Sequence, residues 1–371
     1  MRNPKYIKAT YYIESDSDSL EIAQDIAYGQ SIGNPYIRTP YDEKLDKHLP
    51  QYYANGKHIT IHYPKKNFSV KDGVNYLLSV LMGGQMDIGR IKACRLVDLD
   101  LSPLTKRFPK PRYGVSGIKK LLGVQGRPLF GAIIKPKIGL RPNQMAEVCR
   151  ELAEGGIDFI KEDEILGEAH YAPLKVRVKV ISDALKGFKV LYAPCITADG
   201  GRVLTKAETA QKFGATALHL NIWCGFGSYL HLREYTHLPI FFQKSGDRIL
   251  TTGPYSIESW ILYKLIYLIG CDFAHVGMFG GYLSESVGEI KRRIEAMGSV
   301  IPSFSCGAHP GVVGKLRHLF GDDIMITSGG AIHGHPLGVQ AGAKAFRQAL
   351  NGYTNPPLEL REAIKLWGVV S

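Results

Sequence analysis

A lysine and three carboxylates occupy four consecutive positions near the middle of this 371-residue chain. The mostly apolar segment 155–160 (GGIDFI) leads directly into Lys161, Glu162, Asp163 and Glu164. Side chains alternate between the faces of a strand, so Lys161 and Asp163 are expected to point the same way, with Glu164 at the strand end. Two carboxylates suit a hard cation such as Mg²⁺. An ammonium group would repel that cation, so Lys161 must form a salt bridge or lose its charge, and a lysine that captures CO₂ becomes an anionic carbamate ligand.

This segment and an earlier one resemble the large subunit of RuBisCO. Residues 155–164 read Gly-Gly-x-Asp-Phe-x-Lys-x-Asp-Glu, and residues 131–140 read GAIIKPKIGL. The resemblance implies that Lys161 is carbamylated with CO₂ and binds Mg²⁺ together with Asp163 and Glu164. The alternative is a buried salt bridge in an unrelated barrel.

The composition excludes several classes of function. The net charge is +12, but Lys and Arg are spread along the chain in short pairs, without a recognised nucleic-acid module. We therefore predict no nucleic-acid partner and interpret the charge as a solvated surface that attracts a phosphorylated small molecule. No apolar run approaches the ~20 residues of a membrane span, so we predict no membrane association and a cytoplasmic location. The six cysteines lack CxxC spacing, which argues against zinc and disulfides.

Residues 1–111 are expected to form a small α+β domain. Apolar periodicity predicts three strands and two helices. The proline-rich segment 108–111 (FPKP) is the expected boundary. The predicted strands are Lys8–Glu14, His58–Tyr63 and Ile91–Leu99, and the predicted helices are Ser19–Gln30 and Asn67–Met82.

Residues 112–371 are expected to form a TIM (β/α)₈ barrel. Short apolar strands recur with helical stretches between them, which is typical of parallel βα units. Polar residues gather at the strand ends, where such a barrel carries its active site. The fold class is therefore α/β, and the RuBisCO resemblance implies the same architecture. The predicted strands are Leu129–Pro136, Ile157–Asp163, Val190–Thr197, Ala217–Trp223, Leu238–Lys244, Phe273–Gly277, Ile301–Ser305 and Ile324–Thr327.

Lys135 and Lys137 follow the first barrel strand and, being two apart, are expected on the same face. Proximity to a divalent cation and to each other favours loss of a proton, which equips one of them to move a proton at neutral pH. The RuBisCO resemblance implies a proton-transfer role for Lys135 and a supporting catalytic role for Lys137. The alternative is a pair of surface lysines at a strand end.

Two further residues match substrate-binding positions of RuBisCO. His275, at the end of the sixth predicted strand, matches a histidine that helps to hold one substrate phosphate. Lys244 lies where RuBisCO has a phosphate-binding arginine, and a lysine holds phosphate as a point charge without the bidentate fork.

The loops after the seventh and eighth strands are rich in glycine, at 305–311 (SCGAHPG) and 328–336 (SGGAIHGHP). Glycines let backbone N–H groups converge on an anion, and these two loops form the usual phosphate cradle of a barrel. The expected phosphate-binding residues are Ser305, Gly307, Ser328, Gly329 and Gly330.

Several substitutions argue against CO₂ fixation. Tyr282 stands where carboxylation needs a lysine, so addition of CO₂ to an enediolate lacks its electrostatic support. Gln243 and Asp247 replace histidines of RuBisCO, Gly84 replaces an asparagine of its N-terminal domain, and residues 33–35 (GNP) replace its phosphate-contacting tryptophan. The chain resembles the RuBisCO-like proteins, which keep the enolisation chemistry and act on other substrates.

Within that group, residues 113–123, 308–311 and 333–336 resemble the methionine-salvage enolase of 2,3-diketo-5-methylthiopentyl 1-phosphate. That enolase uses a lysine base at the position of Gly84, which cannot accept a proton. A related branch isomerises 5-methylthioribulose 1-phosphate and depends on a cysteine, a role that Cys306 could fill. The leading hypothesis is this Mg²⁺-dependent isomerase, with Lys135 as proton carrier and Cys306 as a second acid or base. Alternatively, Cys306 is a small structural residue.

Three other functions stay open: the diketo-phosphate enolase with a substitute base, a decarboxylase or hydrolase of a branched 3-oxo sugar acid phosphate, and a non-catalytic binding protein. The RuBisCO resemblance also implies a homodimer with active sites at the subunit interface. Glu14 matches the catalytic glutamate that reaches across that interface in RuBisCO.

Overall fold

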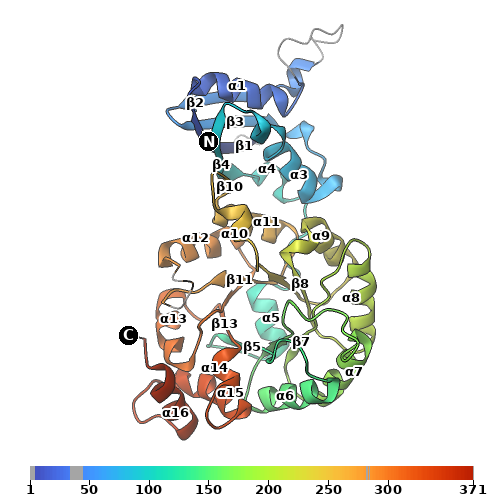
Figure 1. The fold of residues 1–371 in the computed structure, drawn as a ribbon, viewed down its shortest axis with the longest axis vertical. Helices are drawn as coiled ribbons and strands as arrows, with labels where there is room; N and C mark the ends of the chain where they lie inside the picture. The colour runs from blue at the N-terminus through green and yellow to red at the C-terminus, as the bar shows by residue number, and fades with distance from the viewer. Residues whose placement is uncertain (1–4, 34–44, 281–282, 284, 371) are drawn as a thin grey trace.

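The computed structural model describes residues 5–33, 45–280, 283 and 285–370. Figure 1 shows an N-terminal sheet domain above a larger barrel of parallel strands surrounded by helices. The predicted fold class is confirmed, whereas the exact domain boundary near residue 111 stays a prediction. Residues 34, 35 and 282, at which the sequence departs from RuBisCO, lie outside the described part of the chain.

The N-terminal domain is built on a five-stranded sheet whose central strand, β1, alternates buried and more exposed residues. Helix α1 packs against β2 and β3 of this sheet and begins where the Asp18 side chain accepts hydrogen bonds from the amides of Leu20 and Glu21. The strands of this sheet and its helices are β1 (Tyr6–Ser15), β2 (Gln51–Asn55), β3 (His58–Pro64), β4 (Ile91–Asp100), β10 (Tyr255–Ile257), α1 (Ser19–Gly29), α3 (Gly73–Leu81) and α4 (Ser102–Thr105).

One strand of this sheet comes from the barrel half of the chain. β10 pairs in parallel with β4, placing Tyr255 opposite Cys94, and the sheet order is β10-β4-β1-β3-β2. β10 is only three residues long and follows a single helical turn, α10 (Arg248–Thr251), so no apolar alternation in the sequence could reveal it. The two halves of the molecule are therefore joined by backbone hydrogen bonds as well as by the covalent chain.

The barrel consists of eight parallel strands in the order β7-β6-β5-β13-β12-β11-β9-β8. A parallel bridge between Cys195 and His219 links β7 to β8 and brings the two ends of the sheet together. The strands are β5 (Leu129–Ile133), β6 (Phe159–Lys161), β7 (Leu191–Ala193), β8 (Leu218–Asn221), β9 (Ile240–Gln243), β11 (Phe273–Gly277), β12 (Ile301–Phe304) and β13 (Met325–Ser328).

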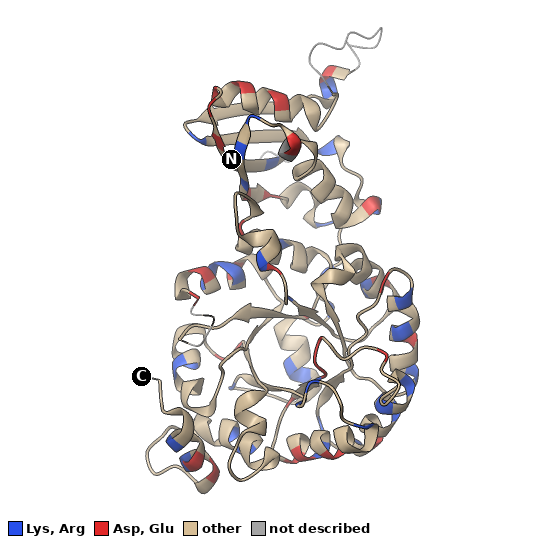
Figure 2. Cartoon of the chain, viewed as in Figure 1, with Lys and Arg blue, Asp and Glu red and all other residues tan. Residues whose placement is uncertain are grey.

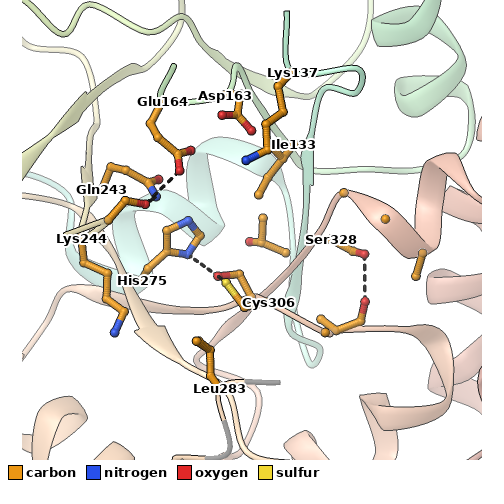
Figure 3. A pocket seen from close by; sticks show the side chains of 18 of the residues that line it. Ile133, Lys137, Asp163, Glu164, Gln243, Lys244, His275, Leu283, Cys306 and Ser328 are labelled. Atoms are coloured by element: carbon orange, nitrogen blue, oxygen red, sulfur yellow. Dashed lines mark hydrogen bonds between the residues drawn. The ribbon is translucent and has the colours of Figure 1, made fainter. Parts of the chain in front are cut away.

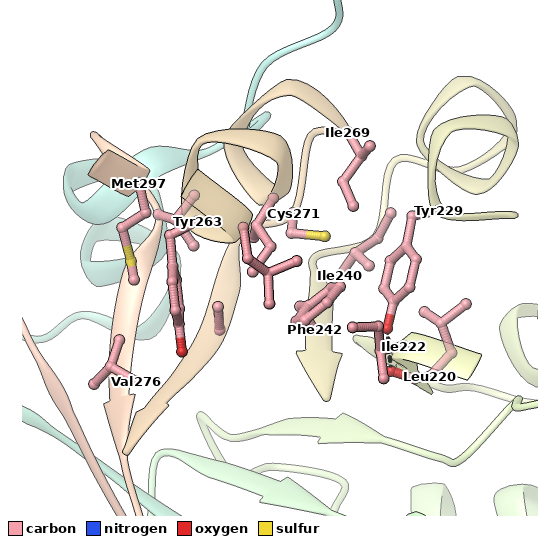
Figure 4. Packing of buried hydrophobic residues seen from close by; sticks show 14 of the residues in the cluster. Leu220, Ile222, Tyr229, Ile240, Phe242, Tyr263, Ile269, Cys271, Val276 and Met297 are labelled. Atoms are coloured by element: carbon pink, nitrogen blue, oxygen red, sulfur yellow. Dashed lines mark hydrogen bonds between the residues drawn. The ribbon is translucent and has the colours of Figure 1, made fainter. Parts of the chain in front are cut away.

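Helices surround this barrel, and a further helix, α5, packs Ile118 and Leu122 against the side chains inside it. Figure 4 shows part of the layer between strands and helices, where Tyr229 and Tyr263 lie among aliphatic side chains. The helices are α5 (Gly114–Leu122), α6 (Pro142–Glu154), α7 (Leu174–Ala184), α8 (Arg202–Lys212), α9 (Phe226–Tyr235), α11 (Ser259–Leu268), α12 (Val287–Met297), α13 (Val313–Phe320), α14 (Gly330–His333), α15 (Val339–Gln348) and α16 (Leu358–Trp367).

The interior of the barrel changes from apolar to polar along the strands. The lower layer holds Phe159, Phe241 and Phe273, which contact one another at ring-centroid distances of 4.8–6.1 Å. Because inward-facing residues recur every second position, the next inward layer falls two residues later on each strand. It contains the polar residues Lys161, His219, Gln243, His275, Ser303 and Thr327.

The predicted strand Phe273–Gly277 is confirmed as β11, and β13 lies one residue later than the predicted Ile324–Thr327. The other six predicted barrel strands agree in place but are longer than the observed ones. Their C-terminal residues, such as Lys135 and Asp163, leave the strand ladder and face the cavity described below. In the N-terminal domain, β2 was not predicted, because its residues are mostly exposed and lack apolar alternation. The predicted helix Asn67–Met82 is wrong at its start: α3 begins only at Gly73, after two short 3₁₀ turns. No helix in the described residues is long and apolar enough to cross a membrane.

Candidate active site

A cavity of about 710 Å³ opens at the C-terminal ends of the barrel strands. Figure 3 shows the side chains that line it, which come from strands and loops far apart in the sequence. The structure brings twelve of the predicted site residues together on its wall: Lys135, Lys137, Asp163, Glu164, Lys244, His275, Ser305, Cys306, Gly307, Ser328, Gly329 and Gly330.

Lys161 lies beneath this wall and is fully buried. Its Nζ donates to the backbone oxygen of Glu162 at 3.1 Å and lies 3.4 Å from His219 Nε2 and 5.5 Å from the centre of the Phe241 ring. Burial lowers the pKa of Lys161 to about 8, although the nearby Glu164 and Asp163 carboxylates act in the opposite direction. At pH 7 the uncharged amine is then roughly 300-fold more abundant than for a lysine in water. The uncharged amine is the form that attacks CO₂.

Lys135 is held at the cavity wall by an ion pair. Its Nζ lies 2.6 Å from Asp163 Oδ2, and the lysine side chain is one quarter exposed while the aspartate is buried. Burial is the largest single influence on the pKa of Asp163 and by itself would raise it. The positive charges of Lys135, and to a smaller extent of Lys161 and Lys137, outweigh burial, so the pKa of Asp163 is lowered. Lys135 also packs closely against the last strand: a Cβ atom on Gly329 would lie 2.8 Å from Lys135 Cε. A larger residue at position 329 would therefore require Lys135 to shift.

Glu164 is oriented by a short polar chain from the neighbouring strand loop. Ser245 Oγ donates to Glu164 Oε1 at 2.9 Å, and Gln243 Nε2 donates to the same hydroxyl at 2.7 Å. The dashed line in Figure 3 marks the contact to Glu164. Gln243 stands where RuBisCO has a histidine, and in this chain it supports a carboxylate through Ser245. Sequence reasoning did not identify Ser245.

Glu162 points away from the cavity and holds the strand from outside. It accepts hydrogen bonds from Arg177 Nε, the Tyr192 hydroxyl and the Cys195 amide at 2.7–2.8 Å, and both members of the Glu162–Arg177 pair are fully buried. The alternation predicted for this segment is therefore confirmed: Asp163 faces the cavity and Glu162 the helices. Arg177, on α7, was missed because nothing in a helix sequence marks the strand that it contacts.

His275 is buried in the middle of β11, rather than at the strand end as expected, in an arrangement that fixes its ring. Ser305 Oγ lies 3.0 Å from His275 Nδ1, and the Phe241 ring meets the imidazole edge-on at 4.7 Å. The Tyr263 hydroxyl, visible in Figure 4, donates to the His275 backbone oxygen at 2.6 Å. Burial, and secondly the Lys161 charge, holds the pKa of His275 well below its usual value. His275 is thus a neutral ring that can donate or accept a hydrogen bond.

Lys244 lies at the cavity wall in contact with two carboxylates. Its Nζ is 3.3 Å from Asp247 Oδ2 and 3.5 Å from Glu285 Oε1, and the lysine side chain is largely buried. Glu285 also lies 2.7 Å from Arg293 NH1. Burial by itself would lower the pKa of Lys244, but Tyr263, Asp247 and Glu285 together raise it. Neither carboxylate was recognised from the sequence as a partner of Lys244.

The two glycine-rich loops line the opposite part of the cavity. Within the described residues, the amides of Gly307 and Gly329 donate to no protein acceptor. Ser328 Oγ donates to the Ala308 backbone oxygen at 2.8 Å and so ties the two loops together, as Figure 3 shows. Free N–H groups on a cavity wall suit an anion such as phosphate.

Cys306 has an unusual backbone conformation. Its φ is 70°, in the left-handed region that disfavours side chains with a Cβ atom. The thiol lines the cavity and lies 3.6 Å from Ser305 Oγ. The other non-glycine residue with positive φ in the described part of the chain, Asn355, lies away from the cavity. A cysteine held at this strained position merits a chemical explanation.

Two residues discussed in the sequence analysis lie away from this cavity. Glu14, on β1, accepts from the Tyr12 hydroxyl at 2.5 Å and lies 3.4 Å from Lys57 Nζ. Gly84 begins a short 3₁₀ turn in the N-terminal domain. Neither lines the cavity of its own chain, so a role for Glu14 requires a second copy of the protein.

The donor set fits a hard cation only when Lys161 is modified. Within the described residues, no three His, Cys, Asp or Glu side chains are grouped to hold a metal ion. Asp163 and Glu164 supply two carboxylates, and a carbamate on Lys161 would supply the third oxygen donor. Because Lys161 lies buried beside both carboxylates with a lowered pKa, the residues fit Mg²⁺ bound in this way.

Comparison with known proteins relates the chain to one family along most of its length. Residues 114–365 match the profile of the ribulose bisphosphate carboxylase large chain, catalytic domain. The 2,3-diketo-5-methylthiopentyl-1-phosphate enolase of Bacillus velezensis is 33% identical over 406 aligned residues, which cover 98% of both chains. An uncharacterized ribulose bisphosphate carboxylase-like protein of Bordetella bronchiseptica is 31% identical and covers 92% of this chain and 91% of its own. The octameric RuBisCO of Pyrococcus horikoshii has a TM-score of 0.89 and 27% identity, covering 99% and 95%.

Proposed function

This chain belongs to the RuBisCO large-chain family, as a RuBisCO-like protein, and on that premise we propose that it is a Mg²⁺-dependent 2,3-diketo-5-methylthiopentyl-1-phosphate enolase. The observation that carries the proposal is the position of Lys135, which lies between the Asp163 carboxylate and the Gly329 loop. A proton carrier placed between a metal-binding carboxylate and a phosphate cradle suits enolisation of a phosphorylated ketone.

The proposed reaction is a tautomerisation. Lys135, once uncharged, removes a proton from the carbon next to a ketone carbonyl, and the electron pair moves to the carbonyl oxygen, which then receives a proton. Substrate and product have the same composition. Mg²⁺, held by Asp163, Glu164 and the Lys161 carbamate, would stabilise the negative charge that develops on oxygen. Lys137, on the same wall, would support Lys135 by raising the local positive potential.

The glycine-rich loops are the proposed phosphate site. The free amides of Gly307 and Gly329, together with Gly330, would bind the 1-phosphate and so place the reacting carbons beside Lys135. Ser305 and His275 already form a hydrogen-bonded pair on the adjacent wall, from which they can orient a substrate oxygen.

The enolase replaces the isomerase as the leading hypothesis, because relatives that are 32–33% identical to this chain are named as enolases. The missing lysine at Gly84 then requires a substitute base. Gly84 lies in the N-terminal domain away from the cavity, whereas Lys135 is already at the wall. We therefore assign the base role to Lys135.

One observation favours a second candidate. The strained, cavity-facing Cys306 suits the isomerisation of 5-methylthioribulose 1-phosphate, in which a thiol would serve as a second acid or base. Both candidates use Lys135 and the same phosphate loops, so they differ in whether the thiol is needed.

The proposal includes a homodimer whose active sites lie at the subunit interface. Glu14 is outside the cavity of its own chain and partly exposed on the N-terminal sheet, so it can act only on the site of a partner. The octameric assembly named for the Pyrococcus RuBisCO shows that a relative of this fold associates with further copies.

Proton NMR in D₂O tests these alternatives directly. The protein, with Mg²⁺ and bicarbonate, is given the diketo phosphate and, separately, 5-methylthioribulose 1-phosphate. We expect loss of the diketone signals with appearance of the vinyl proton signal of the enol, and no new pentulose phosphate from the second substrate. Turnover of only the second substrate would replace the enolase by the isomerase, and the Lys135→Met variant should be inactive with either.

A further inference from the structure

The charges around Lys244 balance within the protein. Lys244 contacts Asp247 and Glu285, and Glu285 also contacts Arg293, so two cations face two carboxylates. The side chains of all four are at most 18% exposed, so water screens the pairs only weakly. Arg248, which also lines the cavity, is exposed to solvent. The buried end of the cavity therefore offers a ligand no net positive charge.

The opposite end of the cavity differs in charge balance. Figure 3 shows Lys244 and Ser328 on opposite sides of the cavity. At the Ser328 side, the amides of Gly307 and Gly329 are free within the described residues, and Lys135 lies against Gly329. One end can thus receive an anion, whereas at the other end an anion would meet the Asp247 and Glu285 carboxylates at close range.

The backbone of Asp247 is held in place beside Lys244, and the Glu285 carboxylate has a second cationic partner, Arg293. Asp247 directly precedes α10, and its backbone oxygen accepts from the amides of Leu250 and Thr251 at 2.9 and 3.0 Å. Glu285 is fixed between Lys244 and Arg293, whose remaining N–H groups donate to Val276 O and Ser259 Oγ. A second phosphate would have to displace this arrangement.

We propose that Asp247 and Glu285 are specificity-determining residues that restrict the site to substrates with a single phosphate and an uncharged far end. This inference rests on the proposed function and revises the expectation that Lys244 binds a substrate phosphate. A dianion placed beside two carboxylates is repelled, whereas an apolar or neutral polar group binds there without this electrostatic repulsion. The discrimination is electrostatic and does not depend on the size of the cavity.

The test compares two ligands that differ only in the second phosphate. Isothermal titration calorimetry of the full-length protein with Mg²⁺ and bicarbonate measures binding of 5-deoxyribulose 1-phosphate and of ribulose 1,5-bisphosphate. We expect the wild type to bind the monophosphate at least about tenfold more tightly. Asp247→Asn and Glu285→Gln should each strengthen bisphosphate binding about tenfold and leave monophosphate binding nearly unchanged. Glu295→Gln, at an exposed position on α12 outside the cavity, is the charge-matched control and should change neither.

Each single variant tests the inference by itself, because the two carboxylates contact Lys244 separately. Equal binding of both ligands by the wild type would overturn the inference. So would a preference for the monophosphate that survives both substitutions, since the exclusion would then be steric. The assay needs no turnover: a protein that discriminates as expected and yet fails to enolise the diketo phosphate would refute only the proposed function.

Discussion

Replacing the buried Lys161 by methionine should make the protein more stable while removing the amine that CO₂ would convert to a carbamate. Burial lowers the pKa of Lys161 from 10.5 to about 8. Such a difference in pKa between the folded and unfolded states corresponds to about 3 kcal/mol of destabilisation at pH 7, where both states bind the proton. Methionine has a similar shape and no charge, but it leaves the Glu162 backbone oxygen without the donor that Lys161 provides, a loss of about 1 kcal/mol. The expected net gain is about 2 kcal/mol.

The pH dependence of this gain identifies its origin. Below pH 8 the lysine is protonated in both states, so the destabilisation is complete. Between pH 8 and 10.5 the folded protein releases the proton first, and the stability of the wild type rises relative to the variant. At pH 10 less than about 1 kcal/mol of the destabilisation remains, so the advantage of methionine should vanish.

Thermal unfolding of both proteins, in CO₂-free and Mg²⁺-free buffer, measures this difference. We expect the Lys161→Met variant to melt roughly 4 °C higher at pH 7 and at about the wild-type temperature at pH 10. Lys291→Met, at an exposed position on α12, controls for the loss of one positive charge. A variant that is less stable than the wild type at pH 7, or whose gain persists at pH 10, would refute the assignment of a desolvated ammonium.

Three other substitutions address separate features. Arg177→Met should destabilise the protein by about 3–5 kcal/mol, because Glu162 would be left charged and buried; thermal unfolding checks this, and recovery in the Arg177→Met, Glu162→Gln double variant would confirm the cause. Cys306→Gly should raise stability by about 0.5–1 kcal/mol, because relief of the backbone strain at φ 70° exceeds the added freedom of the unfolded chain. The same variant should leave enolase turnover unchanged, and a hundredfold loss of turnover would place the thiol in the reaction. Glu14→Ala should lower turnover at least tenfold with an unchanged melting temperature, and normal kinetics would exclude it from a partner's site.

The sequence predicted the residues of the site better than the contacts that hold them. Period-two alternation places Lys161 and Asp163 on one face and Glu162 on the other, and the structure agrees. Strand ends rich in Lys, His and Gly were enough to locate the cavity wall, because a parallel barrel collects all such ends on one side. These signals are local, within a few residues of one strand.

Long-range contacts left no comparable signal. Arg177 lies 15 residues from Glu162, and Glu285 lies 41 residues from Lys244, so their pairing depends on how βα units pack around the barrel. For this reason the sequence, with its net charge of +12, did not indicate that carboxylates balance the charge of Lys244. Figure 2 shows acidic and basic residues interspersed along the helices around the barrel.

The pairing of β10 with β4 has a consequence for attempts to divide this protein. A fragment beginning near residue 112 would keep Tyr255–Ile257 but lose the strand to which it binds, and the partner strand β4 would be left with an open edge on the other fragment. Unpaired strand edges recruit other chains. Expression of either piece alone is therefore expected to yield aggregates, and truncation experiments would report on solubility rather than on catalysis.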